Sequence, residues 1–437
     1  MNADPKSSPI TPHDFVEVES RLPGVRVFAP AQIEDTTPET RTFKCPQCGA
    51  STAYNPNASS VTCSHCGYSQ RLEVVRVGRR AEEREFTLEN LELSERGWGE
   101  DRQELHCQSC GADLSLSMEG SSSGEALSTT CPFCASNQVV ARIATQEVLR
   151  PRFLIPFRLD AQDCVPLARE WLGRGWMHPK NLANAASSAQ FQGLYLPFWT
   201  FDARIQANWK AEVGYPRTER YYDHGSKSWK TRTRIDWRWE SGHTDLKLDD
   251  WLGIGTDKVS RVLQKRLYPF NIQDMVAYEP GFLAGWYAQS FNISLQDAWG
   301  QVKATMREHA KKACRRQIRS SHVRNFSMIA DFADESWRYI LLPVFIAAYR
   351  YQGEVFQVLV NGQTGKISGQ KPIAWWKIWT AIALLLAPGF GLAMIGLPLL
   401  LLAGVGLLPL VGGGIMLIIG IALSIYIYRQ AIKAGEV

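Results

Sequence analysis

Eight of the ten cysteines in this sequence stand in four Cys-x-x-Cys pairs, the spacing that places two thiolates on one tight turn. The pairs form two groups, one with 14 residues between its pairs (49–62) and the other with 20 (111–130). The ligand sets are Cys45, Cys48, Cys63 and Cys66, and Cys107, Cys110, Cys131 and Cys134. Each group predicts a tetrahedral four-thiolate site of the zinc-ribbon type.

Zinc is the expected occupant, as two structural ions per chain. Four thiolates leave no coordination position open for a substrate, and such a site contributes on the order of 10 kcal/mol to folding. A thioredoxin-type redox site is disfavoured because it carries a single Cys-x-x-Cys. Without an apolar leader before the cysteines, we expect a reducing compartment rather than disulfides.

Glycines are expected to shape the metal-binding turns. Gly49, Gly67 and Gly111 follow the first three pairs, where a positive φ would turn backbone N–H groups towards sulfur. Ala135 takes this place in the fourth turn, which we therefore expect to be looser. Eight thiolates and two zinc ions would lower the formal charge from +5 to about +1, so overall charge does not argue for nucleic acid.

The C-terminal end is an uninterrupted apolar run, without Asp, Glu, Lys, Arg or His from Ile378 to Tyr428. As one helix this run would be about 75 Å long, whereas the hydrocarbon core of a bilayer is about 30 Å thick. Two helices with a connection between Gly396 and Gly406 fit this thickness. The run therefore predicts a transmembrane helical hairpin.

The residues beside the hairpin predict its orientation. Lysine or arginine flanks both of its ends and the connection is uncharged, so the positive-inside rule places both ends in the cytoplasm. An aromatic belt is expected at the same interface. The flanking cations are Lys371, Lys377, Arg429 and Lys433, and the aromatic residues are Trp375, Trp376, Trp379, Tyr426 and Tyr428. We therefore expect a multi-pass inner (cytoplasmic) membrane protein with a cytoplasmic N-terminal domain and C-terminus.

Between the cysteines and the hairpin, the sequence predicts an antiparallel-sheet-rich α+β domain. Leu194–Asp202 is typical of a buried strand, and 231–240 alternates threonine, isoleucine and tryptophan with charged residues. Because aromatic and cationic side chains alternate along 231–240, we expect a half-buried strand and not a nucleic-acid surface, which would carry both on one face.

A long helix is expected to begin at Ser294, with Asp297 completing its cap. Its apolar stripe is Leu295, Trp299, Val302, Met306, Ala310 and Ala313. Cations from Lys303 to Arg319 cover its other sides, where they would meet anionic lipid, phosphate or, as favoured here, only water.

These observations divide the chain into seven parts. We expect a disordered tail, two zinc ribbons joined by a charged linker, the α+β cytoplasmic domain, the transmembrane hairpin and a short cytoplasmic tail. Their ranges are 1–41 (tail), 42–71 (ribbon 1), 72–104 (linker), 105–147 (ribbon 2), 148–372 (α+β domain), 373–430 (hairpin) and 431–437 (C-terminal tail).

The sequence resembles a bacterial group of membrane-anchored double zinc-ribbon proteins. The features that match are the two groups of cysteines, the terminal apolar hairpin, and the segments Leu154–Phe157, Leu196–Trp199 and Asn361–Lys366. Members are often labelled as similar to primosomal replication-restart helicase. The resemblance implies a zinc-binding membrane protein. A GxxxxGK[ST] loop is missing from this sequence, so we expect no ATPase activity.

Three functions are compatible with these features. The favoured one is a non-enzymatic adaptor that presents its ribbons, on flexible joints, to a cytoplasmic partner, which we expect to be a protein. The second is a membrane-tethered nucleic-acid binder that uses the ribbons and the Lys303–Arg319 face. The third is a hydrolase built on His178, His224 or His243, for which no acid, base and nucleophile stand at a recognisable spacing.

Overall fold

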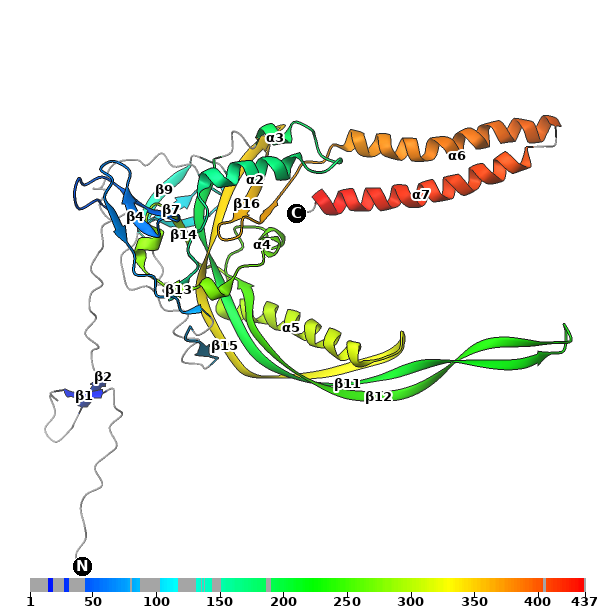
Figure 1. The fold of residues 1–437 in the computed structure, drawn as a ribbon, viewed down its shortest axis with the longest axis horizontal. Helices are drawn as coiled ribbons and strands as arrows, with labels where there is room; N and C mark the ends of the chain where they lie inside the picture. The colour runs from blue at the N-terminus through cyan, green and yellow to red at the C-terminus, as the bar shows by residue number, and fades with distance from the viewer. Residues whose placement is uncertain are drawn as a thin grey trace, which may run out of the picture. The chain divides into compact units, whose positions relative to one another are not determined.

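Three long antiparallel strands organise the protein, with β11 (Gln192–Asp223) between β12 (Ser228–Ile254) and β15 (His322–Tyr351). Figure 1 shows these strands as a curved sheet whose β11–β12 pair continues beyond β15. The computed structural model describes residues 15–18, 27–30, 44–78, 81–86, 103–116, 131–134, 136, 138–143, 151–185, 190–403 and 406–435.

The chain also contains shorter elements. The first are β1 (Phe15–Val18), β2 (Val27–Pro30), β3 (Thr52–Asn55), β4 (Ser60–Cys63), β5 (Ser69–Arg71), β6 (Arg84–Glu85), β7 (Gln103–Cys107), β8 (Asp113–Leu116), β9 (Val139–Ile143) and β10 (Phe153–Leu154). Then follow α2 (Ala161–Gly173), α3 (Leu182–Ala185), α4 (Arg261–Arg266), η2 (Ile272–Asp274), β13 (Val276–Ala277), η3 (Pro280–Leu283), β14 (Tyr287–Gln289), α5 (Leu295–Gln317), β16 (Glu354–Asn361), β17 (Ile367–Gly369), α6 (Trp375–Ala403) and α7 (Leu407–Gly435).

The N-terminal residues up to Thr42 form a unit separate from the rest of the chain. Within this unit, β1 and β2 pair as antiparallel strands, from Phe15 opposite Pro30 to Val18 opposite Val27. The segment expected to be a tail therefore contains one short hairpin.

Burial along β11 changes in three steps, and each step follows from the sequence. Leu194–Ala203 is buried on both faces, as expected for a segment in which only Thr200 and Asp202 are polar. From Arg204 to Val213 buried and exposed residues alternate, because α5 covers only one face. From Tyr215 the strand is exposed on both faces, in the part where β15 no longer pairs with it.

The position of residues 231–240 corrects an expectation from the sequence. They lie in β12, towards the far end of the β11–β12 pair, and most of them are exposed on both faces instead of half-buried. Their register also places tyrosines of β11 on the cationic face, since Tyr215 lies opposite Asp236 and Tyr221 opposite Lys230. The alternation of residues in β12 alone therefore did not predict which side chains share a face once β11 is paired with it.

Bulges interrupt the pairing of all three long strands at the level of Asp202. The register of β11 shifts between Phe201 and Ala203 against β12, and between Asp202 and Arg204 against β15. Asp250 and Asp334 on the flanking strands have φ of 57° and 53° there, a left-handed conformation that aspartate tolerates better than most residues. These bulges bring the acidic side chains at this level to one place beside the sheet.

Helix α5 begins as the sequence predicts. Ser294 is its N-cap, and its side chain accepts a hydrogen bond of 3.1 Å from the Asp297 N–H. The buried stripe includes Cys314 where the sequence suggested Ala313, which is only half-buried. Several of its cations have local partners: Lys303 contacts Glu335 at 2.8 Å, and the guanidinium of Arg315 lies over the Phe326 ring. Much of the cationic face is therefore used within the fold.

The two ribbons are packed onto the main domain. In ribbon 2, β8 pairs with β14, so that β7, β8 and β9 extend the large sheet. In ribbon 1, the Tyr54 N–H donates to the Ala284 carbonyl and the Tyr54 ring contacts Phe282. These contacts differ from the flexible joints expected from the sequence, because edge-strand pairing and an aromatic contact fix the described parts of each ribbon.

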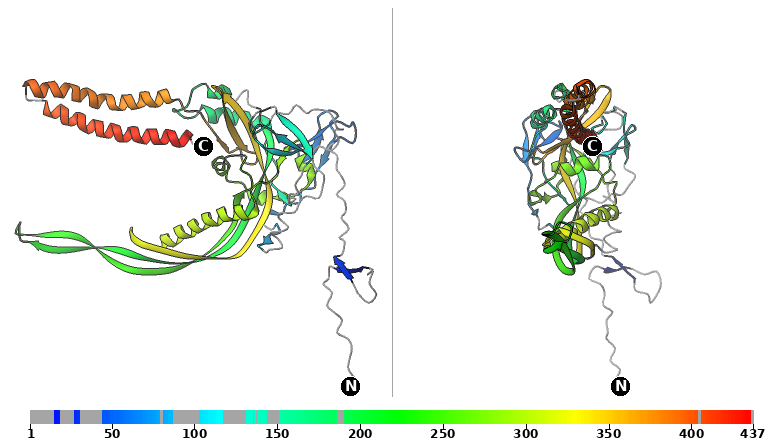
Figure 2. Two further views of the ribbon diagram at one scale, coloured as in Figure 1. Left: turned by 180° about the vertical axis from the view of Figure 1, so that it is seen from behind. Right: turned by 90° about the vertical axis from the view of Figure 1, so that its right-hand side faces the viewer.

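Helices α6 and α7 lie side by side (Figure 1 and the left view of Figure 2), with α6 ending at Ala403 and α7 beginning at Leu407. Trp375–Leu400 and Leu407–Ile432 are long and apolar enough to cross a membrane. Only 11% of the most apolar window in each is buried within the protein, whereas the core helix of a soluble protein would be mostly buried. The two apolar C-terminal helices and their connection thus agree with the predicted hairpin.

Candidate metal centres

The structure brings the eight predicted cysteine ligands together in the two predicted groups of four. Within each group the sulfur atoms all lie within 4.8 Å of one another. Cysteines of different turns approach one another closely, with Cys45–Cys66 at 3.3 Å and Cys48–Cys63 at 3.6 Å in ribbon 1. Ribbon 2 has Cys107–Cys134 at 3.6 Å and Cys110–Cys131 at 3.7 Å.

These separations fit a metal ion. Four sulfurs at about 2.3 Å from a tetrahedral zinc would stand about 3.8 Å apart, close to the distances observed. Both donor sets are composed entirely of thiols, which suits zinc and disfavours calcium and magnesium. The cysteines would hold the ion as thiolates, and its role there would be structural.

Backbone geometry closes the metal-binding turns. Gly49, Gly67 and Gly111 have φ of 72°, 75° and 67°, as the sequence predicts. The N–H of Gly49 donates to the Cys45 carbonyl at 2.8 Å, which closes the turn. The expectation of a looser fourth turn rests on Ala135, which lies outside the described residues.

The pKa of one cysteine in each ribbon is lowered. For Cys63, the main cause is a hydrogen bond from the Cys66 N–H to the sulfur, and its pKa falls to about 6. For Cys107, burial raises the pKa, but hydrogen bonds from the Cys110 and Ser109 N–H groups outweigh it, so that the pKa is about 7. Each ribbon thus has one thiol whose pKa is lowered, whereas its neighbours do not share this shift: burial raises the pKa of Cys110 to about 11, and the pKa of Cys66, which shares a hydrogen bond with Cys45, is raised to about 12.

The two centres differ in what they expose. In ribbon 1 both metal-binding turns are open to solvent, including Ser64 and His65 between the second pair of cysteines. In ribbon 2, Pro132 and Phe133 of the second turn are buried, and the Phe133 carbonyl accepts a hydrogen bond from Gln357. Ribbon 1 therefore offers an accessible surface, whereas the second turn of ribbon 2 forms part of the domain core.

A buried arginine forms a further cluster that the sequence analysis missed. The guanidinium of Arg338 contacts Asp250 at 2.6 Å, Glu83 at 3.0 Å and Asp202 at 3.7 Å. Carboxylate oxygens of Glu83, Asp202 and Asp249 lie within 4.8 Å of one another. Burial raises the pKa of Asp202 to about 8, with further contributions from hydrogen bonds to Glu83 and Asp249. The cluster joins the segment 81–86 to the main sheet.

A sequence signal for this cluster exists. Arg338 interrupts the buried apolar stretch that follows Trp337, and Asp202 follows the apolar run that begins at Leu194. An ionisable residue inside an apolar run is buried only when it has a partner, so the two positions indicate polar contacts within the core. Their pairing depends on the register of β11 against β15, which the sequence does not contain.

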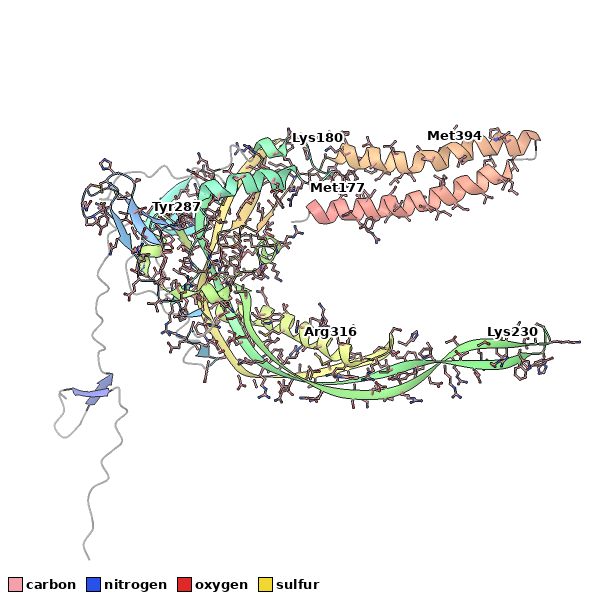
Figure 3. The ribbon with its side chains drawn as sticks, in the orientation of Figure 1. Met177, Lys180, Lys230, Tyr287, Arg316 and Met394 are labelled. Carbon is pink, nitrogen blue, oxygen red and sulfur yellow. The ribbon has the colours of Figure 1, made fainter. Side chains whose placement is uncertain are left out.

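The base of the hairpin is attached to the loop after α2. The His178 Nδ1 lies 3.0 Å from the Pro372 carbonyl, and Lys377 donates to the His178 carbonyl at 2.6 Å. Met177 packs between Ile378 of α6 and Ala431 of α7, and Figure 3 places it beside the start of α6. The apolar helices are thus fixed to the domain through side chains and backbone.

The three histidines considered for a hydrolase lie in separate surroundings. His178 is at the base of the hairpin, His224 contacts the Tyr222 ring, and His243 contacts Asn208 at 2.9 Å. The structure does not bring these three residues together.

The chain is similar to the uncharacterized protein YdjG of Bacillus subtilis (strain 168). The two are 25% identical over 347 residues, which cover 77% of this chain and 91% of YdjG. No protein-family model and no solved structure matches the chain.

Proposed function

We propose that this chain is a membrane-anchored zinc-binding adaptor, which binds two structural zinc ions and presents ribbon 1 to a cytoplasmic protein partner. The anchor is the α6–α7 hairpin, placed in the inner membrane with both ends in the cytoplasm because of its flanking cations. No catalytic step is part of this proposal.

The adaptor proposal rests on the difference in solvent exposure between the metal-binding turns of the two ribbons. A zinc site that only stabilised the domain would need no accessible face, as in the second turn of ribbon 2. Ribbon 1 keeps both turns exposed while its strands are fixed by Tyr54. A small rigid surface held in one place suits recognition of a protein, since little ordering is required on binding.

The experiment is cross-linking in intact membranes with a surface variant that keeps all eight cysteines. Ser64→Glu combined with His65→Glu changes the exposed turn of ribbon 1, and Gln108→Glu is the control on the exposed turn of ribbon 2. We expect the first variant to lose a protein adduct that the control retains. Identical adducts in both variants would contradict the role of ribbon 1.

The alternative is a membrane-tethered nucleic-acid binder without helicase activity, which uses the ribbons and the cationic residues of α5. It requires binding that weakens steeply with salt, because phosphate contacts release counterions. Adducts to nucleic acid that disappear as salt rises would support the alternative over the adaptor. The contacts of Lys303 and Arg315 within the fold favour the adaptor.

A further inference from the structure

The far end of the β11–β12 ribbon is a surface that the proposed adaptor function does not use. From Tyr215 opposite Asp236 to Asp223 opposite Ser228, the two strands pair only with each other within the described residues. Nine residues in each strand extend about 30 Å. Figure 3 shows the exposed side chains of this ribbon and places Lys230 near its end. An isolated two-stranded ribbon is marginally stable in water, which indicates that a partner covers it.

The composition of residues 215–236 is basic. Six lysines and arginines stand against three acidic residues, a net charge of +3. Two of the acidic residues are paired inside the ribbon, Glu219 with Arg232 and Asp223 with Lys230. For Arg220 and Lys227 no ion pair is found in the described part of the chain. The surface therefore favours an anionic partner.

The rings along the ribbon are not equivalent. Nearer the domain, a cation lies over one side of each ring: Arg324 is 4.0 Å from the centroid of Trp237, and Lys210 is 4.7 Å from that of Trp239, which is still 55% exposed. At the end, Tyr222 and Trp229 are cross-strand partners whose rings meet edge to face at 5.5 Å. Trp229 remains 66% exposed. Its ring is thus available to a partner.

Arg220 joins these two rings on one face. It stands two residues before Tyr222 in β11, and alternate residues of a strand share a face. Lys227 lies in the adjoining turn. We call Arg220, Tyr222, Trp229 and Lys227 the tip face. Tryptophan, tyrosine and basic residues together are typical of the headgroup region of a membrane, where a ring is partly buried and cations meet lipid phosphates.

We propose that the tip face is a second membrane contact, which inserts its rings among the headgroups of an anionic phospholipid bilayer. This inference rests on the membrane anchor of the proposed function and not on the zinc ribbons. The anchor keeps a bilayer within reach of the chain, so that even a weak contact is made efficiently. Nucleic acid fits less well, because each tyrosine that shares a face with most of the cations already has an arginine over its ring, Arg232 over Tyr221 and Arg238 over Tyr215.

The test is hydrogen–deuterium exchange of the full-length chain in nanodiscs of phosphatidylcholine, with or without phosphatidylglycerol. We expect backbone amides of residues 219–231 to exchange more slowly only when phosphatidylglycerol is present. Trp229→Ala should abolish this protection. The matched control is Trp239→Ala, which removes an exposed tryptophan of the same strand away from the tip face and should retain the protection.

A charge variant tests the electrostatic part. Arg220→Gln combined with Lys227→Asn should weaken the contact about 25-fold, since each basic residue near an anionic leaflet contributes about a factor of five.

Equal exchange in both kinds of nanodisc, or an equal effect of Trp239→Ala, would overturn the proposal. Protection by single-stranded oligonucleotides but not by phosphatidylglycerol would show a nucleic-acid site instead. A chain that does not co-migrate with nanodiscs at all would contradict the anchor, and this contact with it.

Discussion

At the scale of residues, the chemistry of the eight paired cysteines determines what the two ribbons can bind. Four thiols whose sulfurs stand 3.3–3.7 Å apart across two turns repel one another once ionised, unless a cation lies between them. The lowered pKa of Cys63 and of Cys107 favours ionisation at neutral pH. The two groups are therefore suited to a metal dication and not to four free thiols.

The first prediction concerns metal content. The purified chain should contain two zinc ions, and Cys63→Ser should contain one, because three remaining ligands hold zinc weakly. Cys164→Ser removes a buried thiol outside both groups and should leave two zinc ions. Elemental analysis with protein quantification measures both values. A Cys63→Ser chain that retained two tightly bound zinc ions would refute the assignment.

The second prediction concerns Asp202. Its pKa in the folded chain is about 8 against a reference value of 3.8, so the folded state binds the proton more tightly than the unfolded state. The contribution of Asp202 to stability is therefore present below about pH 4 and decreases as the pH rises to about 8. In the Asp202→Asn variant, the free energy of unfolding should lack the decrease between about pH 4 and about pH 8 that comes from Asp202.

Urea unfolding midpoints at several pH values between about 5 and about 8 measure this effect. The control is Asp245→Asn, because pairing with Arg204 lowers the pKa of Asp245 and places its titration below this window. The same pH dependence in wild type and in Asp202→Asn would contradict the raised pKa.

At the scale of elements, glycines determine how closely α6 and α7 pack. Gly389 and Gly396 in α6, and Gly406, Gly413 and Gly420 at and within α7, recur every seven residues and therefore lie on one face of each helix. A Cβ at Gly413 would stand 2.9 Å from backbone atoms of Ala393 and Gly389. Small residues at such positions let membrane helices approach closely.

The third prediction follows from this contact. Gly413→Ala should lower the melting temperature of the chain in detergent or nanodiscs, because the added methyl group forces the two helices apart. Gly412→Ala is the matched control, since a Cβ there has no neighbour within 4 Å. That variant should melt at the wild-type temperature or slightly above it, as alanine favours a helix. Equal effects of the two substitutions would show that the close helix contact is wrong.

At the scale of the whole molecule, the hairpin can anchor the zinc ribbons at the cytoplasmic side of the membrane only if both of its ends face the cytoplasm. The attachment of α6 to the loop at Met177 and His178 keeps the domain next to the membrane surface if the helices span it. An even number of spans then places the last residues on the same side as the zinc centres.

The fourth prediction is the topology. A reporter fused after Val437 should be cytoplasmic, whereas a tag inserted at residues 404–406 should be accessible from outside. Protease protection in right-side-out vesicles and in inverted vesicles measures both positions. An external C-terminus would mean one span or three and would contradict the hairpin.

The amino-acid sequence alone determined the features that depend on local chemistry. Cysteine spacing predicted the ligand sets, since Cys-x-x-Cys turns close within a few residues. Apolar length predicted two helices with a connection between Gly396 and Gly406, because the thickness of a bilayer limits each helix. The capping pair predicted the start of α5 at Ser294, as a cap forms within one helical turn.

Only the tertiary structure decided the features that depend on pairing over long sequence distances. The exposed state of 231–240, the attachment of both ribbons and the Arg338 cluster all depend on which strand lies beside which, and in what register. Apolar and charged residues alternate in the same way in a half-buried strand and in a strand at the unpaired end of a two-stranded sheet. The sequence alone could therefore not distinguish the two. The composition of the tip face likewise depends on Tyr222 and Trp229 meeting across two strands.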